Sequence, residues 1–172
     1  MSTTPVTDAD RAILTAQLGR VPRGVIGIGA RCRCGQPLVV VTAPRLEDGT
    51  PFPTFFYLTH PAIVKGVSVL EARGDMAGMN EELGADEVLA TAYQRAHEDY
   101  IARREEHGQV PEIAGVSAGG MPTRVKCLHA LVGHALAVGP GVNPFGDRAV
   151  ELLAAEGHWS AETCVCEVTA AE

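Results

Sequence analysis

Four of the five cysteines in this 172-residue chain stand in two short pairs that could bind a metal ion. Cys32 and Cys34 lie near the beginning, Cys164 and Cys166 lie near the end, and one residue separates the members of each pair. In an extended segment, side chains two residues apart point to the same side, so each pair would present both thiols together. Four thiolates are a ligand set that suits Zn²⁺, although structural zinc pairs usually enclose about two to four residues. The alternative is that reduced thiols pack as small apolar groups.

The fifth cysteine belongs to a segment that also contains two histidines. The sequence predicts a helix from Thr123 to Val138, with Pro122 suited to its first position and a glycine and proline stop after it. On such a helix Cys127 and His134 would lie roughly on one face, whereas His129 would point elsewhere. The residues that could replace one cysteine in a zinc site are Cys127, His129, His134 and His60.

A glycine-rich segment precedes this expected helix and suggests an anion site. Ser117, Gly119 and Gly120 would present backbone N–H groups at a helix start, where the unpaired N–H groups and the helix dipole attract anions. Arg124 and Lys126 would add positive charge. We therefore expect a phosphate or carboxylate site, although no Walker or GxGxxG motif is present. The alternative is that the glycines only turn the chain and the two basic residues are solvated.

Two further residues could transfer protons at such a site. His97 lies on the tyrosine-bearing side of a predicted helix, where a histidine is more often a satisfied core residue than a base. Asp147 follows the glycine-rich region and could serve a metal or a proton. Asn143 is a further candidate ligand-binding residue, although its place before Pro144 is explained by helix capping alone. If the site is catalytic, metal-assisted hydrolysis is the natural chemistry, with a metal-bound water as the nucleophile.

The framework expected to position these residues is three consecutive short strands and a helical remainder, which predicts an α+β fold. We expect a small antiparallel sheet of about three strands packed with four to six helices. A hairpin would hold the first cysteine pair in its connection. Strands are predicted over residues 25–28, 38–42 and 54–58, and helices over 9–18, 60–74, 76–83, 86–107, 123–138 and 144–154.

The composition favours one cytoplasmic domain over residues 1–172, with flexible ends at about 1–6 and 168–172. No apolar run is long enough to span a membrane, and the first residues do not resemble a secretory signal. The formal net charge of −7 disfavours broad nucleic-acid binding. A local basic patch could still dock a protein partner. Its residues are Arg20, Arg23, Arg31 and Arg33.

Several long segments together resemble a known bacterial family, domain-of-unknown-function family 501. These segments are LGRVPRG, RCRCGQP, LEDGTPFPTFFYLTHP, LEARGDM, AHEDY, AGVSAGGMPTRVKCLHALVGHALAVGPGVNPFGD and CVC. The resemblance implies a link to polyphosphate or cell division, because genes of this family are often found beside an exopolyphosphatase and a septum formation initiator. It carries over no catalytic or metal role for any residue.

Three hypotheses follow from the sequence. The first is a protein that binds zinc or a small phosphorylated ligand through the Cys/His region, with possible metal-assisted hydrolysis. The second is a noncatalytic partner protein in cell division or polyphosphate regulation, with structural zinc or no metal. The third is a thiol redox sensor, in which exchange between the two cysteine pairs is easier than closing a strained ring within one pair.

Overall fold

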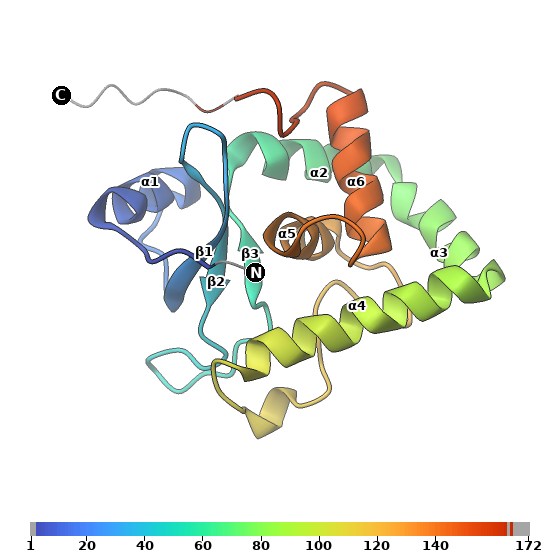
Figure 1. Cartoon of the computed structure of the whole chain (residues 1–172), viewed down its shortest axis with the longest axis horizontal. Coiled ribbons are helices and arrows are strands. Elements are labelled where there is room, and N and C mark those ends of the chain that lie inside the picture. Colours follow the sequence, from blue (N-terminus) through green and yellow to red (C-terminus); the bar gives the residue numbers. More distant parts are fainter. Residues whose placement is uncertain (1–2, 165, 167–172) are drawn as a thin grey trace.

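The computed structural model describes residues 3–164 and 166 of the chain (Figure 1). The described part has the predicted α+β fold, with a three-stranded antiparallel sheet and six α-helices. The strands are β1 (Val25–Arg31), β2 (Pro37–Thr42) and β3 (Phe56–Leu58). The helices are α1 (Asp8–Leu18), α2 (Pro61–Arg73), α3 (Asp75–Ala85), α4 (Glu87–Glu105), the short η1 (Pro111–Ile113), α5 (Leu128–Val138) and α6 (Pro144–Ala155).

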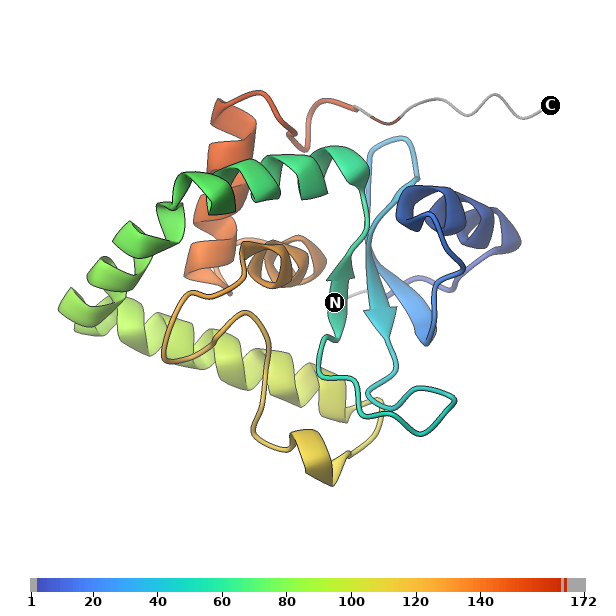
Figure 2. The ribbon, with the colours of Figure 1, turned by 180° about the vertical axis from the view of Figure 1, so that it is seen from behind.

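The sheet has the order β1-β2-β3 and is covered on both faces. All six residues of the central strand β2 are buried. Because successive side chains of a strand point to opposite faces, Val39 and Val41 enter the main hydrophobic core, whereas Val40 packs with Leu14 of α1 and Ile28 of β1. Figures 1 and 2 show α1 on one side of the sheet and α5 on the other.

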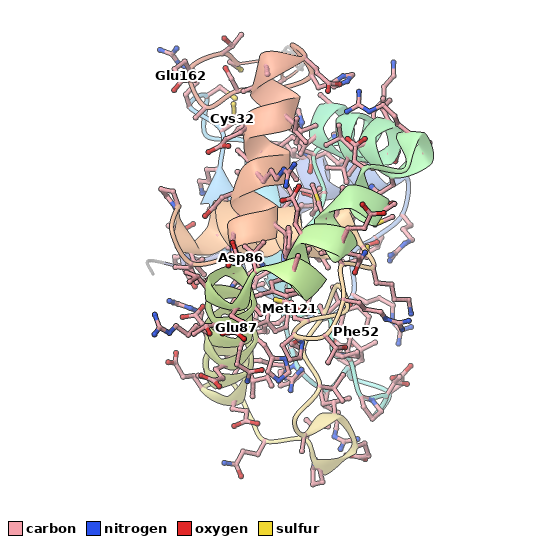
Figure 3. All side chains as sticks on the ribbon, turned by 90° about the vertical axis from the view of Figure 1, so that its right-hand side faces the viewer. Cys32, Phe52, Asp86, Glu87, Met121 and Glu162 are labelled. Atoms are coloured by element: carbon pink, nitrogen blue, oxygen red, sulfur yellow. The ribbon has the colours of Figure 1, made fainter. Side chains whose placement is uncertain are left out.

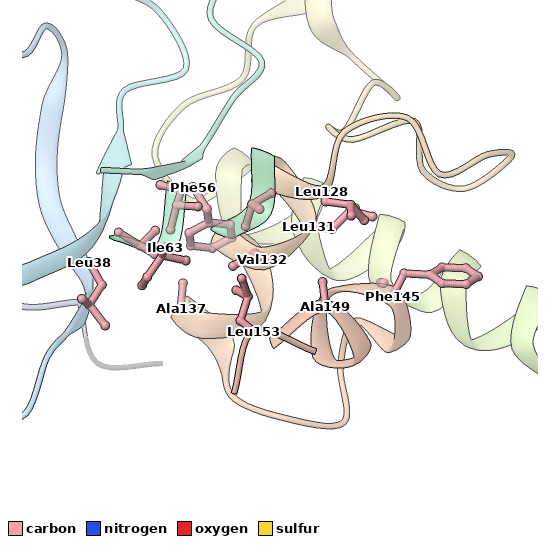
Figure 4. Close-up of a cluster of buried hydrophobic side chains, with 14 of the residues drawn as sticks. Leu38, Phe56, Ile63, Leu128, Leu131, Val132, Ala137, Phe145, Ala149 and Leu153 are labelled. Carbon is pink, nitrogen blue, oxygen red and sulfur yellow. The ribbon is translucent and has the colours of Figure 1, made fainter. Parts of the chain in front are cut away.

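Helix α5 lies at the centre of the main core, between β3 and α6 (Figure 4). Glycines allow these elements to approach closely. A Cβ at Gly133 of α5 would lie 3.0 Å from the carbonyl oxygen of Phe56, and one at Gly146 of α6 would lie 2.4 Å from that of Leu131. The close approach fixes α5 against both neighbours, and its first turn therefore has a defined place beside α2 and β3.

Local capping signals account for most of the helix boundaries. Thr7 and Asp10 form a reciprocal capping box at the start of α1, and Gly19 ends that helix in the left-handed conformation. The side chain of Asn143 accepts a hydrogen bond from the backbone N–H of Gly146 and caps α6, as predicted. The three strands and five of the six long helices agree with prediction within a few residues.

The predicted start of the helix at residues 122–123 was wrong, because α5 begins only at Leu128. The Asn80 side chain accepts from the Val125 N–H at 2.8 Å and donates to the Val125 carbonyl at 2.8 Å. The Tyr93 hydroxyl donates to the Arg124 carbonyl. These contacts occupy backbone groups that a helix would use, so Cys127 becomes the residue before α5.

Over residues 3–164 and 166, no helix has both the length and the apolar character needed to cross a membrane.

Candidate metal centre

The β1–β2 hairpin presents the first cysteine pair on a tight turn. The Gly35 N–H donates to the Cys32 carbonyl at 2.8 Å, and the Cys32 N–H donates to the Gln36 carbonyl at 2.8 Å. Gly35 has a φ of 92°, in the left-handed region that favours glycine. The turn leaves Cys32 buried and Cys34 exposed.

The segment after α6 brings the second cysteine pair to this hairpin. Trp159 is 5% exposed and anchors the segment to the main core. The guanidinium of Arg33 then donates a hydrogen bond to the carbonyl of Glu162. Figure 1 shows the segment that follows α6 approaching the hairpin tip, and Figure 3 shows Cys32 and Glu162 at the same end of the molecule.

The two cysteine pairs meet in space. The Sγ atoms of Cys32, Cys34, Cys164 and Cys166 all lie within 4.8 Å of one another, and none of these cysteines forms a disulfide. Four sulfurs at Zn–S distances of about 2.3 Å in a tetrahedron are about 3.8 Å apart. A small contraction of the cluster would therefore give the geometry of a four-thiolate zinc site.

A cation would balance the negative charge that the four thiols acquire when they ionise. A hydrogen bond from the Gln36 backbone N–H, together with the neighbouring thiols, lowers the pKa of Cys34 to about 7. Burial, followed by the adjacent cysteines, raises the pKa of Cys166. Adjoining thiolates repel one another, so the four cannot all ionise unless a positive charge lies between them. A metal ion bound to the deprotonated thiols would supply that charge.

His60, which the sequence offers as a possible replacement ligand, lies buried beside this cluster. The side chain is 3% exposed, and its Nε2 atom lies 3.2 Å from the Sγ of Cys166. Burial lowers the pKa of His60. A neutral imidazole with its proton on Nε2 can donate to a Cys166 thiolate. The local sequence shows only that His60 precedes a helix, whereas its burial depends on the distant C-terminal segment.

A second cluster contains Cys127 and His129 together with Glu71 of α2. One ligand atom from each of these residues lies within 4.8 Å of the other two. The Nδ1 atom of His129 is 3.2 Å from Oε1 of Glu71. The predicted sharing of one helix face by Cys127 and His134 was wrong, because Cys127 precedes α5 in an extended conformation. Its thiol is instead hydrogen-bonded to His129, which raises the pKa of that imidazole to about 9.

His134 and Asn143 form a buried hydrogen-bond network instead of an accessible ligand site. Both are 0% exposed. The Asn143 amide donates to His134 Nδ1 at 3.1 Å, so His134 carries its proton on Nε2 and donates it to Asp99 at 3.0 Å. The imidazole also stacks on Phe56 with ring centroids 5.3 Å apart. Both ring nitrogens are used inside the protein, and the network joins α4, α5 and α6.

The anion site predicted at Ser117, Gly119 and Gly120 does not have the expected local structure. The carbonyl of Gly119 accepts hydrogen bonds from the N–H groups of Lys126 and Cys127. These bonds close a loop between the glycine segment and the residues before α5, and no helix begins at the glycines. Arg124 and Lys126 are exposed. The first N–H of α5, at Leu128, donates to the Glu71 carboxylate at 2.7 Å. The helix start therefore does attract an anion, but the anion is a side chain of this protein.

The two candidate proton-transfer residues lie in separate settings. His97 Nδ1 is 2.8 Å from the Ser117 hydroxyl, which brings two of the predicted site residues together. Gly120 lies nearby in the chain, where a Cβ would come within 2.5 Å of the Arg124 carbonyl. Asp147 accepts from the Gly141 N–H at 2.8 Å, and burial raises its pKa. Its carboxylate thus orders the turn before α6.

Three residues of the basic patch have partners within the protein. Arg31 binds the buried carboxylate of Asp10 through two hydrogen bonds of 2.6 and 2.9 Å. Arg23 is paired with Asp48, and Arg33 with the Glu162 carbonyl.

Sequence analysis missed Glu71 as a site residue, because nothing in α2 marks it and its partners are far along the chain.

The comparisons with known proteins identify the family but no function. A search of curated proteins and a search of solved structures found no match. A family model matches residues 28–151, a range that contains the first cysteine pair, Glu71, Cys127 and His129 and that ends before Cys164. The match covers most of the chain, and the chain therefore belongs to the family described as protein of unknown function, DUF501.

Proposed function

We propose that this protein is a zinc-binding protein in which Cys32, Cys34, Cys164 and Cys166 hold one Zn²⁺. The observation that carries the proposal is the meeting of four sulfur atoms within 4.8 Å, contributed by two segments at opposite ends of the chain. Thiolate sulfur is a preferred zinc ligand, and four such ligands complete a tetrahedral site.

The surroundings of the cluster support this ligand set. Backbone N–H groups of Gln36 and Cys166 are hydrogen-bonded to the sulfurs of Cys34 and Cys164, and such bonds stabilise thiolates. His60 can donate a further hydrogen bond to Cys166. Groups that bond to ligand atoms from outside the coordination sphere orient those ligands and strengthen metal binding.

A structural role for this zinc follows from its ligand count. Four protein ligands leave no open position for water or substrate, which is the arrangement of structural zinc sites. The ion would fasten the segment after α6 to the β1–β2 hairpin. Since the unfolded chain has no preformed site, the free energy of zinc binding would contribute to the stability of the folded protein.

Elemental analysis combined with variants tests this proposal. The untagged protein should retain about one zinc per chain, and Cys34→Ser and Cys166→Ser should lose it together with thermal stability. Cys127→Ser is the matched control, because Cys127 lies outside the cluster, and it should keep the zinc held by the four cysteines. A metal-free protein in which mass spectrometry finds a reversible disulfide between the two pairs would reject structural zinc in favour of redox sensing.

A further inference from the structure

We propose that Glu71, Cys127 and His129 form a second metal site, one with an open coordination position that faces a pocket. The site would take a zinc-like divalent cation. It uses different residues from the four-cysteine cluster, so it stands or falls independently of the proposed structural zinc.

The geometry of the three residues suits a tetrahedral ion. Their ligand atoms lie within 4.8 Å of one another, and the distance from Glu71 Oε1 to His129 Nδ1 is 3.2 Å. Bonds of about 2.0 to 2.1 Å from zinc to nitrogen and oxygen place two tetrahedral ligands about 3.3 Å apart. One carboxylate and one thiolate would also balance the double positive charge of the ion.

The hydrogen bonds of His129 orient its Nδ1 atom towards Glu71, where a metal ion would bind. Its Nε2 atom lies 3.2 Å from the carbonyl oxygen of Val64, which can only accept a hydrogen bond. Nε2 therefore carries a proton. Nδ1 faces Glu71 and Cys127, which favour a second proton on the ring, and a divalent cation that binds Nδ1 would displace that proton. A histidine that binds a metal through one nitrogen and donates the other N–H to a backbone carbonyl has the usual arrangement of a metal ligand.

The other two ligands are also held from outside the cluster. The N–H of Leu128 donates to Glu71 Oε1 at 2.7 Å. The backbone N–H of Ala130 is hydrogen-bonded to the thiol of Cys127, which stands at the N-terminus of α5, where the helix dipole favours a thiolate. All three side chains are thus positioned before any ion binds.

A pocket gives the site access to a ligand. An open pocket of about 580 Å³ lies between the start of α2, β3 and the start of α5, and both Cys127 and His129 line it. Three protein ligands leave a fourth position, as in catalytic zinc sites, where water or a substrate atom binds. Lys65 also lines the pocket and would favour an anionic group there.

Cobalt titration of the zinc-loaded full-length protein tests this site. Tetrahedral Co²⁺ with one thiolate ligand should give visible d–d bands and a near-ultraviolet charge-transfer band. Cys127→Ser should remove the charge-transfer band. Glu71→Gln retains an oxygen that can accept from the Leu128 N–H, so it should leave the fold intact while raising the Kd for Co²⁺ by about tenfold or more.

Two further variants test whether the cobalt signal comes from this site alone. Glu81→Gln changes an exposed carboxylate on α3 and should leave the cobalt affinity unchanged. Cys34→Ser, which disrupts the other cluster, should retain the second-site bands. Failure to bind a further equivalent of Co²⁺, or bands that persist in Cys127→Ser, would overturn the proposal. Rapid alkylation of Cys127 that Co²⁺ does not slow would overturn it too, in favour of a thiolate–imidazolium pair.

Discussion

The imidazole Nε2 of His60 lies 3.2 Å from the Sγ of Cys166, although the two residues are 106 positions apart in the sequence. The contact joins the start of α2 to the segment that follows α6. It places a buried hydrogen-bond donor at the edge of the four-cysteine cluster, which gives the first testable consequence.

Replacing His60 should weaken zinc binding without removing a zinc ligand. In His60→Ala, the Cys166 thiolate loses a donor outside the coordination sphere, and we expect the zinc affinity to fall by about 10-fold to 100-fold. Competition with a chromophoric chelator measures the change. His107→Ala alters an exposed histidine elsewhere and should match the wild type. Equal affinities in all three proteins would show that the His60 contact does not support the metal.

The second cluster should respond to added anions, whereas the four-cysteine cluster should not. If Glu71, Cys127 and His129 leave one position open, inorganic phosphate should bind there and shift the d–d bands of cobalt in that site. Cobalt confined to the four-cysteine cluster in Cys127→Ser should have a spectrum that phosphate leaves unchanged. Spectra that are insensitive to phosphate in both proteins would indicate a closed second site.

Asp99 should make the protein more stable above about pH 4 than below it. Burial by itself would raise the pKa of Asp99, but hydrogen bonds from His134 and Arg103 outweigh it and hold the pKa below its ordinary value. The folded state therefore favours the carboxylate, and its contribution is lost as the pH falls below about 4, the range in which the unfolded chain takes up the proton.

Denaturant unfolding at several pH values measures this effect. We expect Asp99→Asn to lower the free energy of unfolding at pH 7 by about 1 to 3 kcal/mol, and the difference from the wild type to shrink in acid. Asp8→Asn, at an exposed position of α1, is the control. A difference that stays constant down to pH 3 would mean that the charge of Asp99 is not what stabilises the network.

Gly146 should be one of the least replaceable residues of the core. A methyl group there would lie 2.4 Å from the Leu131 carbonyl and would push α6 away from α5, so Gly146→Ala should cost about 1 to 3 kcal/mol of stability. Gly78→Ala, in α3, meets no atom within 4 Å and should stabilise the helix by up to about 1 kcal/mol. Thermal unfolding of both variants checks the pair, and equal effects would contradict the proposed close packing of α5 and α6.

The elements that could be predicted from the sequence are those with local signals. Asn143 followed by Pro144 marks the start of α6, and a run of β-branched residues marks β2, because capping and strand propensity depend on neighbouring residues. The start of α5 could not be predicted. It depends on the side chain of Asn80, which holds the backbone of Val125 from 45 residues away.

The candidate sites also combine features that the local sequence indicates with features that depend on distant residues. The types and spacing of Cys32 and Cys34 pointed to a metal, but their meeting with the second pair depends on how the segment after α6 returns to the hairpin. Similarly, Cys127 and His129 were recognised as candidate ligands, whereas Glu71 was not. Its position beside them results from the packing of α2 against α5, which no pattern within either helix specifies.

X-ray absorption at the zinc edge tests the central claim most directly. The measurement is best made on Cys127→Ser, because this variant leaves only the four-cysteine cluster able to supply thiolates. We predict a first shell of four sulfur atoms at about 2.3 Å, with no oxygen or nitrogen neighbour. A zinc-free protein, or a shell composed mainly of oxygen and nitrogen, would contradict the claim that Cys32, Cys34, Cys164 and Cys166 hold a structural zinc ion.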